Sequence, residues 1–242
     1  MRSIVPLMIV LLACFAGCKK DEKTTGQVSF TISNKVDSLN LQLGQMAYTT
    51  SEGNTYQVDL LKYYITNFTF LRADGSTYNA KNYDLIDAEN PASWNIQLSG
   101  IPNGTYTGLR FYLGVDSTKN FVLDQTGDLD PANNMFWTWS TGYIFFKHEG
   151  FFINSNGLQQ TLRLHYGGPV ALSTIEVPVA FIVDADQKHI DMTFNLNALY
   201  NSPTPIDLDV DYDHQSALAN ERTWLATMNQ NFTTAFTITG VH

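Results

Sequence analysis

Cysteine is almost absent from this sequence of 242 residues, and both cysteines, Cys14 and Cys18, stand close to the start. The chain beyond them therefore has no disulfide, no thiolate nucleophile and no cysteine ligand for a metal. In an oxidising compartment it must be stable through packing alone, without the disulfides that small secreted domains use. Its length is sufficient for that, since a chain of this size buries a large core.

Basic residues are also scarce, because 14 lysines and arginines face 23 aspartates and glutamates, which gives a net charge of −9. Nucleic-acid binding needs clustered Lys and Arg to replace counterions, and no such cluster exists beyond residues 19–23. We therefore expect no nucleic-acid partner.

Catalytic signatures are missing too: there is no Gly-x-Ser-x-Gly elbow, His-Glu-x-x-His pair or glycine-rich phosphate loop. We expect a protein that is not an enzyme.

The first residues read as a targeting segment. Arg2 precedes an apolar run over residues 4–15, which is too short to span a bilayer and ends in Ala16 and Gly17. This order predicts a signal peptide over residues 1–17. Residues 15–18, Phe-Ala-Gly-Cys, fit a lipobox, so we expect Cys18 to be lipidated and residues 18–25 to form a tether. The alternative is an ordinary signal peptide cut nearby, with Cys18 lost.

Short runs of β-branched and aromatic residues that alternate with polar ones dominate the rest, and Gly, Pro, Asn and Asp bound them. They predict strands over residues 26–33, 56–70, 84–88, 95–98, 105–113, 160–166, 177–183, 189–196 and 232–239. Residues 216–230 have helical spacing, and residues 116–134 read as a long loop. The expected fold is all-β, a β-sandwich with one short C-terminal helix, in a single domain over residues 26–242.

Alternating aspartates occupy residues 207–213 and would share one face of an extended segment. Carboxylate oxygens suit Ca²⁺. The segment lacks the glycine and the terminal glutamate of an EF-hand loop, which favours a solvated strand or loop over a calcium site.

An aromatic segment over residues 135–150 follows the long loop and contains Trp137 and Trp139. Aromatics at positions i and i+2 of a strand point to the same face. On residue pattern alone, packing in the core or at one end of the sandwich is the leading interpretation, since large aromatics dominate burial.

The run Trp-Thr-Trp-Ser-Thr-Gly-Tyr-Ile-Phe-Phe-Lys-His-Glu-Gly over residues 137–150 resembles the signature of the MbnP-like family of extracytoplasmic copper-binding proteins. Further stretches resemble the family in the same order. They are residues 61–67, 98–106, 109–115, 164–168 and 228–236.

The resemblance implies copper binding through histidines and an oxidised tryptophan, kynurenine, which a partner di-haem enzyme of the cytochrome c peroxidase type produces. Carried over to this chain, it names His165 as the candidate ligand and Trp137 or Trp139 as the candidate for oxidation. Imidazole is a suitable copper ligand.

Two departures from the family pattern concern that site. Asn34 stands where a first-strand histidine is expected, and His148 occupies a position that is usually apolar. The second ligand stays open among the four remaining histidines, His148, His189, His214 and His242.

The sequence thus predicts an outer-membrane lipoprotein, facing the periplasm or the cell surface, that binds or traffics copper. The alternatives are a metal-free surface lipoprotein whose aromatic segment binds a glycan or a protein, and a structural lipoprotein with a buried aromatic corner.

Overall fold

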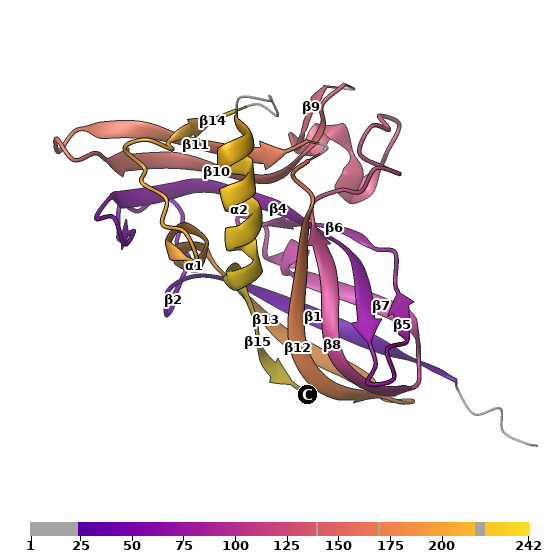
Figure 1. The fold of residues 1–242 in the computed structure, drawn as a ribbon. Helices are drawn as coiled ribbons and strands as arrows, with labels where there is room; N and C mark the ends of the chain where they lie inside the picture. Colours follow the sequence, from indigo (N-terminus) through magenta and orange to yellow (C-terminus); the bar gives the residue numbers. More distant parts are fainter. Residues whose placement is uncertain (1–23, 139, 169, 216–220) are drawn as a thin grey trace, which may run out of the picture.

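The computed structural model describes residues 24–138, 140–168, 170–215 and 221–242. The expected all-β sandwich with a short C-terminal helix is confirmed: two sheets pack face to face, and one longer helix stands against them (Figure 1). The predicted signal peptide, Cys18 and Trp139 lie outside the described residues.

The smaller sheet has five strands, with β13 and β1 parallel at its centre. Its outer strands are antiparallel to these two: β15 pairs with β13, and β7 and β2 both pair with β1. The strands are β1 (Thr25–Val36), β2 (Leu39–Asn40), β7 (Asn95–Pro102), β13 (Gln187–Asn195) and β15 (Phe236–Val241).

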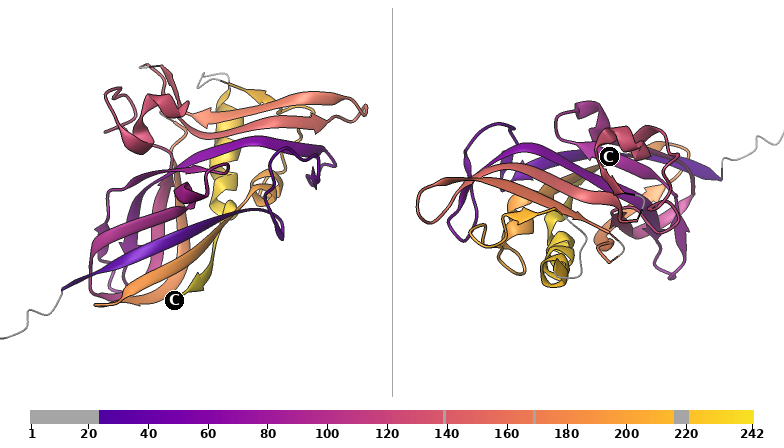
Figure 2. Two further views of the ribbon diagram at one scale, coloured as in Figure 1. Left: turned by 180° about the vertical axis from the view of Figure 1, so that it is seen from behind. Right: turned by 90° about the horizontal axis from the view of Figure 1, so that it is seen from above.

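The larger sheet has ten strands, ordered β12-β8-β4-β10-β11-β14, with β3, β5 and β6 also paired to β4, and β9 paired to β10. Its strands are β3 (Tyr48–Thr49), β4 (Thr55–Leu71), β5 (Thr77–Asn79), β6 (Tyr83–Asp87), β8 (Gly104–Leu113), β9 (Phe136–Thr138), β10 (Gly142–Ile153), β11 (Gln159–Gly167), β12 (Ser173–Val183) and β14 (Asp213–His214). The β10–β11 hairpin extends beyond the smaller sheet (Figure 2).

Aromatic side chains fill the space between the sheets. Phe30 of β1 stacks on Phe68 of β4 with ring centroids 4.4 Å apart, and Tyr63 of β4 lies 4.8 Å from Phe194 of β13. All four rings are fully buried. Burial of large apolar side chains is the main source of stability here, at about 25 cal/mol per Å² of apolar surface.

The helices differ from the prediction over residues 216–230. The helix α2 runs from Arg222 to Ala235, so residues 232–235, expected as strand, are helical. Phe232 continues the helical spacing of Leu225 and Met228, and its ring packs 5.2 Å from Phe146 of β10. Burial of this face outweighs the strand preference of the following threonines.

A second helix, α1 (Leu196–Asn201), was not expected; Asn195 caps it by accepting from the backbone N–H of Asn197 at 3.1 Å. The described residues also form short 3₁₀ turns, among them η1 (Pro91–Trp94), η2 (Gly127–Leu129) and η3 (Pro131–Asn133). In the part of the chain that the structure describes, no helix is both long and apolar enough to cross a membrane.

The aspartate-rich residues 207–213 form turns and bends that end in β14, in agreement with a loop. Asp209 accepts hydrogen bonds from the backbone N–H of Ser155 and from the side chain of Asn54, at 3.0 and 3.3 Å. The carboxylate of Asp209 therefore links its own segment to the segments that contain Ser155 and Asn54.

Side chains of β10 alternate between the core and the outer face. Phe146 and His148 point into the sandwich, whereas Lys147 and Glu149 point away from it. His148 is fully buried beside the hydroxyl of Tyr200, which comes from α1. Burial lowers the pKa of His148 to about 3, although the carbonyl of Gln57 and the charge of Glu149 oppose the shift.

The buried imidazole predicts acid sensitivity. Because the folded-state pKa of His148 lies below that of an unfolded histidine, near 6.5, the unfolded state binds the extra proton and stability falls as pH drops below about 6.5, by up to about 1.4 kcal/mol per pH unit. His148→Gln removes this slope and keeps a hydrogen-bonding group for Tyr200. Urea unfolding of both proteins at pH 7 and pH 5 measures the difference; parallel losses of stability would contradict the prediction.

Candidate metal site

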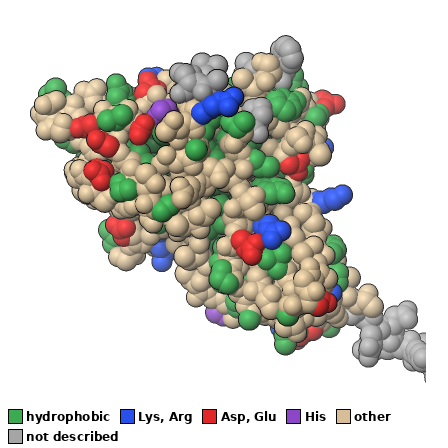
Figure 3. Space-filling view, viewed as in Figure 1, with side chains coloured by type: hydrophobic (Ala, Val, Ile, Leu, Met, Phe, Trp, Pro, Cys, Tyr) green, Lys and Arg blue, Asp and Glu red, His purple; other side chains and the backbone are tan. Residues whose placement is uncertain are grey.

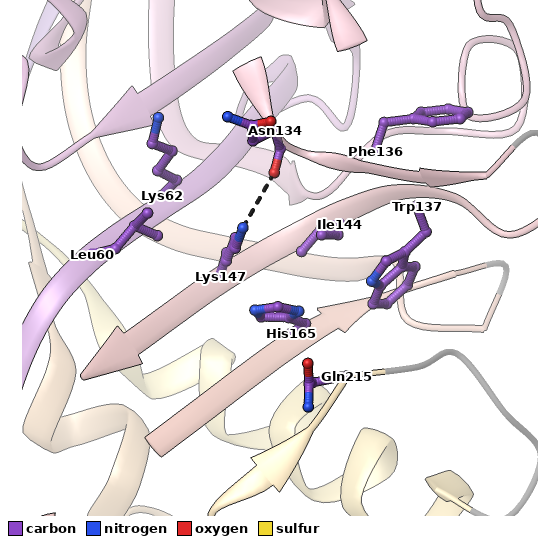
Figure 4. A pocket seen from close by; sticks show the side chains of 9 residues that line it. All are labelled: Leu60, Lys62, Asn134, Phe136, Trp137, Ile144, Lys147, His165 and Gln215. Carbon is purple, nitrogen blue, oxygen red and sulfur yellow. Dashed lines mark hydrogen bonds between the residues drawn. The ribbon is translucent and has the colours of Figure 1, made fainter. Parts of the chain in front are cut away.

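A pocket of about 420 Å³ opens on the outer face of the larger sheet, beside the β9–β10 turn. It combines two lysines, one histidine and an aromatic wall (Figure 4). The residues that line it are Leu60, Lys62, Asn134, Phe136, Trp137, Ile144, Lys147, His165 and Gln215.

Strand register places the polar residues of the pocket in one row. Lys147 of β10 is paired with Lys62 of β4 on one side and with His165 of β11 on the other. Lys62 is paired in turn with Asp87 of β6. Directly opposed residues of antiparallel strands point to the same face. The four side chains therefore lie side by side in a row across the outer face of the larger sheet.

His165 lies at the centre of a hydrogen-bonded group. Its Nε2 is 2.8 Å from Oε1 of Glu149, and Nζ of Lys147 is 3.3 Å from the same oxygen. An ionised carboxylate only accepts hydrogen bonds, so Nε2 carries the proton and Nδ1 keeps its lone pair. Glu149 therefore fixes the tautomer of His165.

The electrostatics agree with that tautomer. Burial by itself raises the pKa of Glu149, but the hydrogen bond from His165 and the charge of Lys147 hold it below its ordinary value. Burial lowers the pKa of His165, and the bond to Glu149 opposes that shift only in part. At neutral pH the pair is thus a carboxylate and a neutral imidazole, which is the form that binds metals.

The long loop over residues 116–134 positions the aromatic wall. Its Asn120 accepts from the backbone N–H of Tyr143 at 2.8 Å, and the carbonyl of Asp128 accepts from the hydroxyl of Tyr64 at 2.9 Å. Gly142 makes the turn after β9 with φ of +78°, where a Cβ would collide with Asn120. The half-buried indole of Trp137 extends from β9 toward the end of β11 (Figure 4).

Two of the predicted site residues, Trp137 and His165, therefore line the same pocket, although β9 and β11 are separate strands. Trp139 cannot be placed, since it lies outside the described residues. Asn34 is elsewhere: it is buried on β1, accepts from the hydroxyl of Tyr63 at 2.7 Å and lines a smaller pocket with Trp94.

The other histidines do not join His165 in the pocket. His148 faces the core, and His189 and His242 meet at the smaller sheet. His214 precedes the pocket residue Gln215, but its ring stacks on Trp224 with centroids 4.0 Å apart and its Nε2 faces Asp211. Within the described residues, no three His, Cys, Asp or Glu side chains are arranged to hold a metal ion.

Four further residues of the site, Lys62, Lys147, Glu149 and Gln215, were not among the candidates predicted from the sequence. Lys147 and Glu149 flank His148 in the aromatic segment, and the period of a strand would have placed both opposite to it. The sequence around Lys62 and Gln215 contains no such periodic signal. Only the pairing of β4, β10, β11 and β14 brings these two residues to the pocket.

The donors fit copper in part. A neutral imidazole held by a carboxylate through its other nitrogen is the usual arrangement of a metal-binding histidine. The described residues supply one such ligand, and the indole of Trp137 lies on the same pocket. Acidic side chains gather on the side of the molecule that β10, β11 and β14 occupy (Figure 3).

Comparison with known proteins gives two findings. The family model described as MbnP matches residues 25–220. The solved structure of MbnP from Methylosinus trichosporium superposes with a TM-score of 0.50 at 17% identity, over 72% of this chain and 77% of that one. This similarity shows a shared fold. A comparison with curated proteins gave no match.

The Glu149–His165 hydrogen bond leads to a prediction about the pKa of His165 that can be tested in solution. Glu149→Gln should lower the pKa of His165, because it removes the charge and weakens the bond that favour the imidazolium. Lys147→Met should raise it, because it removes a neighbouring positive charge. NMR titration of the histidine ring protons measures both, with His189 as internal control. Shifts in the same direction in the two variants would contradict the geometry.

Proposed function

The chain belongs to the MbnP family, and on that premise we propose that it binds copper as cargo in the pocket between β9, β10 and β11. Nδ1 of His165 is the proposed ligand atom, and the indole of Trp137 forms the adjacent wall. The protein acts by binding and transfer, without catalysis.

The observation that supports this most is the Glu149–His165 hydrogen bond of 2.8 Å. It orients the imidazole, leaves Nδ1 unprotonated and raises the basicity of the ring. Here the described residues form a hydrogen bond with Nε2 of His165 alone, and the side chain borders the pocket.

Trp137 is the proposed site of the oxidation that the family resemblance implies. Its indole is half-buried and lines the pocket, so a product amine would form beside His165. The proposed catalyst of this oxidation is a di-haem enzyme of the cytochrome c peroxidase type, with a peroxide as the oxidant and oxygen source, and the open face of this pocket would be its docking side.

A lipid anchor at Cys18 is part of the proposal, with the outer membrane as its location. β1 enters the sandwich at the end remote from the β9–β10 turn (Figure 1). An anchor joined to that end by a short tether directs the pocket away from the bilayer. A soluble partner then reaches the pocket without contact with lipid.

Copper titration of the purified protein tests the proposal. We expect binding at one site per chain, and His165→Ala should weaken it by about tenfold or more, since even the orienting partner of a metal-bound histidine contributes that much. His189→Ala is the matched control, because His189 lies on β13 and does not line the pocket. Competition with a chromogenic copper chelator measures the affinities.

Intact mass and peptide mapping of the same preparations report oxidation of Trp137. Copper binding that is equal in the wild type and in His165→Ala would exclude this pocket as the site. Absence of binding in both would favour a metal-free lipoprotein that uses the aromatic segment for another ligand.

A further inference from the structure

We propose that copper enters this pocket as a complex with a small carboxylate-bearing chelator, rather than as the hydrated ion. The inference rests on the proposed function and names the form of its cargo. Three properties of the pocket point to it: its size, its donors and its charge.

The size is that of a small-molecule site. A volume of about 420 Å³ lies within the range of roughly 300–1,000 Å³ that ligand pockets occupy. A metal ion held by protein side chains alone needs no such space, because its ligands lie about 2 Å from it. The pocket therefore has room for an organic ligand beside His165.

The donors that the described residues place at the pocket are too few for the bare ion. Of the His, Cys, Asp and Glu side chains that the structure describes, only His165 lines the pocket. Copper favours several nitrogen or sulfur ligands at once. The remaining coordination positions must then be filled from outside the described residues, and a chelator that arrives with the metal fills them.

The charge disfavours a free divalent cation. Lys62 and Lys147 line the pocket, whereas the carboxylates nearest to them, Asp87 and Glu149, do not. Each carboxylate is already engaged, Asp87 with Lys62 at 2.9 Å and Glu149 with Lys147 and His165. Two lysines balance two carboxylates, so the pocket offers no net negative charge to an incoming ion.

The lysines can hold a carboxylate. Nζ of Lys147 is 3.3 Å from Glu149 and 3.4 Å from the carbonyl of Asn134, and both distances exceed the 2.7–2.9 Å of a strong charge-assisted hydrogen bond. An ammonium has three donors. Lys62 and Lys147 lie on one side of the pocket and Trp137 on the other, with His165 close to Lys147 (Figure 4).

The proposed complex thus has its metal at Nδ1 of His165 and its carboxylates at the ammonium groups. Two copper(II) complexes test this because each leaves coordination positions open for an imidazole. Copper iminodiacetate carries two carboxylates and is neutral, whereas copper diethylenetriamine has amine donors only and is dicationic. Calorimetry compares their binding to the purified protein, with hydrated copper(II) as a third probe.

We expect the iminodiacetate complex to bind at least about tenfold more tightly than the triamine complex, a difference of about 1.4 kcal/mol. Lys62→Met should abolish this preference without touching the Glu149–His165 pair. Asp87→Asn is the matched control, because it frees the ammonium of Lys62 and should strengthen the preference. His165→Ala should weaken both complexes, whereas His189→Ala should change neither.

Equal affinities for the two complexes, or a preference that survives Lys62→Met, would overturn the inference and leave His165-dependent copper binding intact. Tighter binding of hydrated copper than of the iminodiacetate complex would overturn it as well. If none of the three probes binds, the proposed function fails together with the inference.

Discussion

The two-residue alternation of β10 decides which of its polar side chains belongs to the core and which to the pocket. His148 points inward and is buried as a neutral imidazole beside Tyr200, while Lys147 and Glu149 point outward to His165. A register shift of one residue would bury two charges and expose Phe146, which is far less stable. The aromatic core that fixes this register therefore also fixes the site.

On the outer face of the larger sheet, the hydrogen bond of His165 and the ion pair of Lys147 are coupled through Glu149. One carboxylate oxygen accepts from both His165 and Lys147, so the orientation of the imidazole and the placement of the ammonium depend on the same atom. The two lysines, Lys62 and Lys147, balance the charges of the two carboxylates, Asp87 and Glu149. Only the ammonium groups of this set line the pocket, so a ligand with carboxylates of its own is the kind that they can bind.

Much of the fold could be predicted from the sequence, because alternation along strands and turn residues between them are local signals. β4 and β8 follow the predicted ranges within one residue at each end. α1 and the last turn of α2 could not be predicted in this way, since packing of Tyr200 and Phe232 decides them. Trp137 and His165 were named through family resemblance, whereas Lys62 required the pairing of β4 with β10, which no local pattern encodes.

A metal site to which the described residues contribute one imidazole suits a protein that passes copper on better than a protein that stores it. Affinity for a metal rises with the number of ligands that the protein supplies, and most of that gain appears as slower release. A site with one oriented histidine, and with the other donors on the chelator, releases its cargo when that one contact breaks. Asn34 of β1, where the family resemblance leads us to expect a histidine, lies outside this pocket and accepts a hydrogen bond from the hydroxyl of Tyr63 in the core. For the proposed transfer of copper, the oriented imidazole of β11 and the open face around it are the two features that a partner would use.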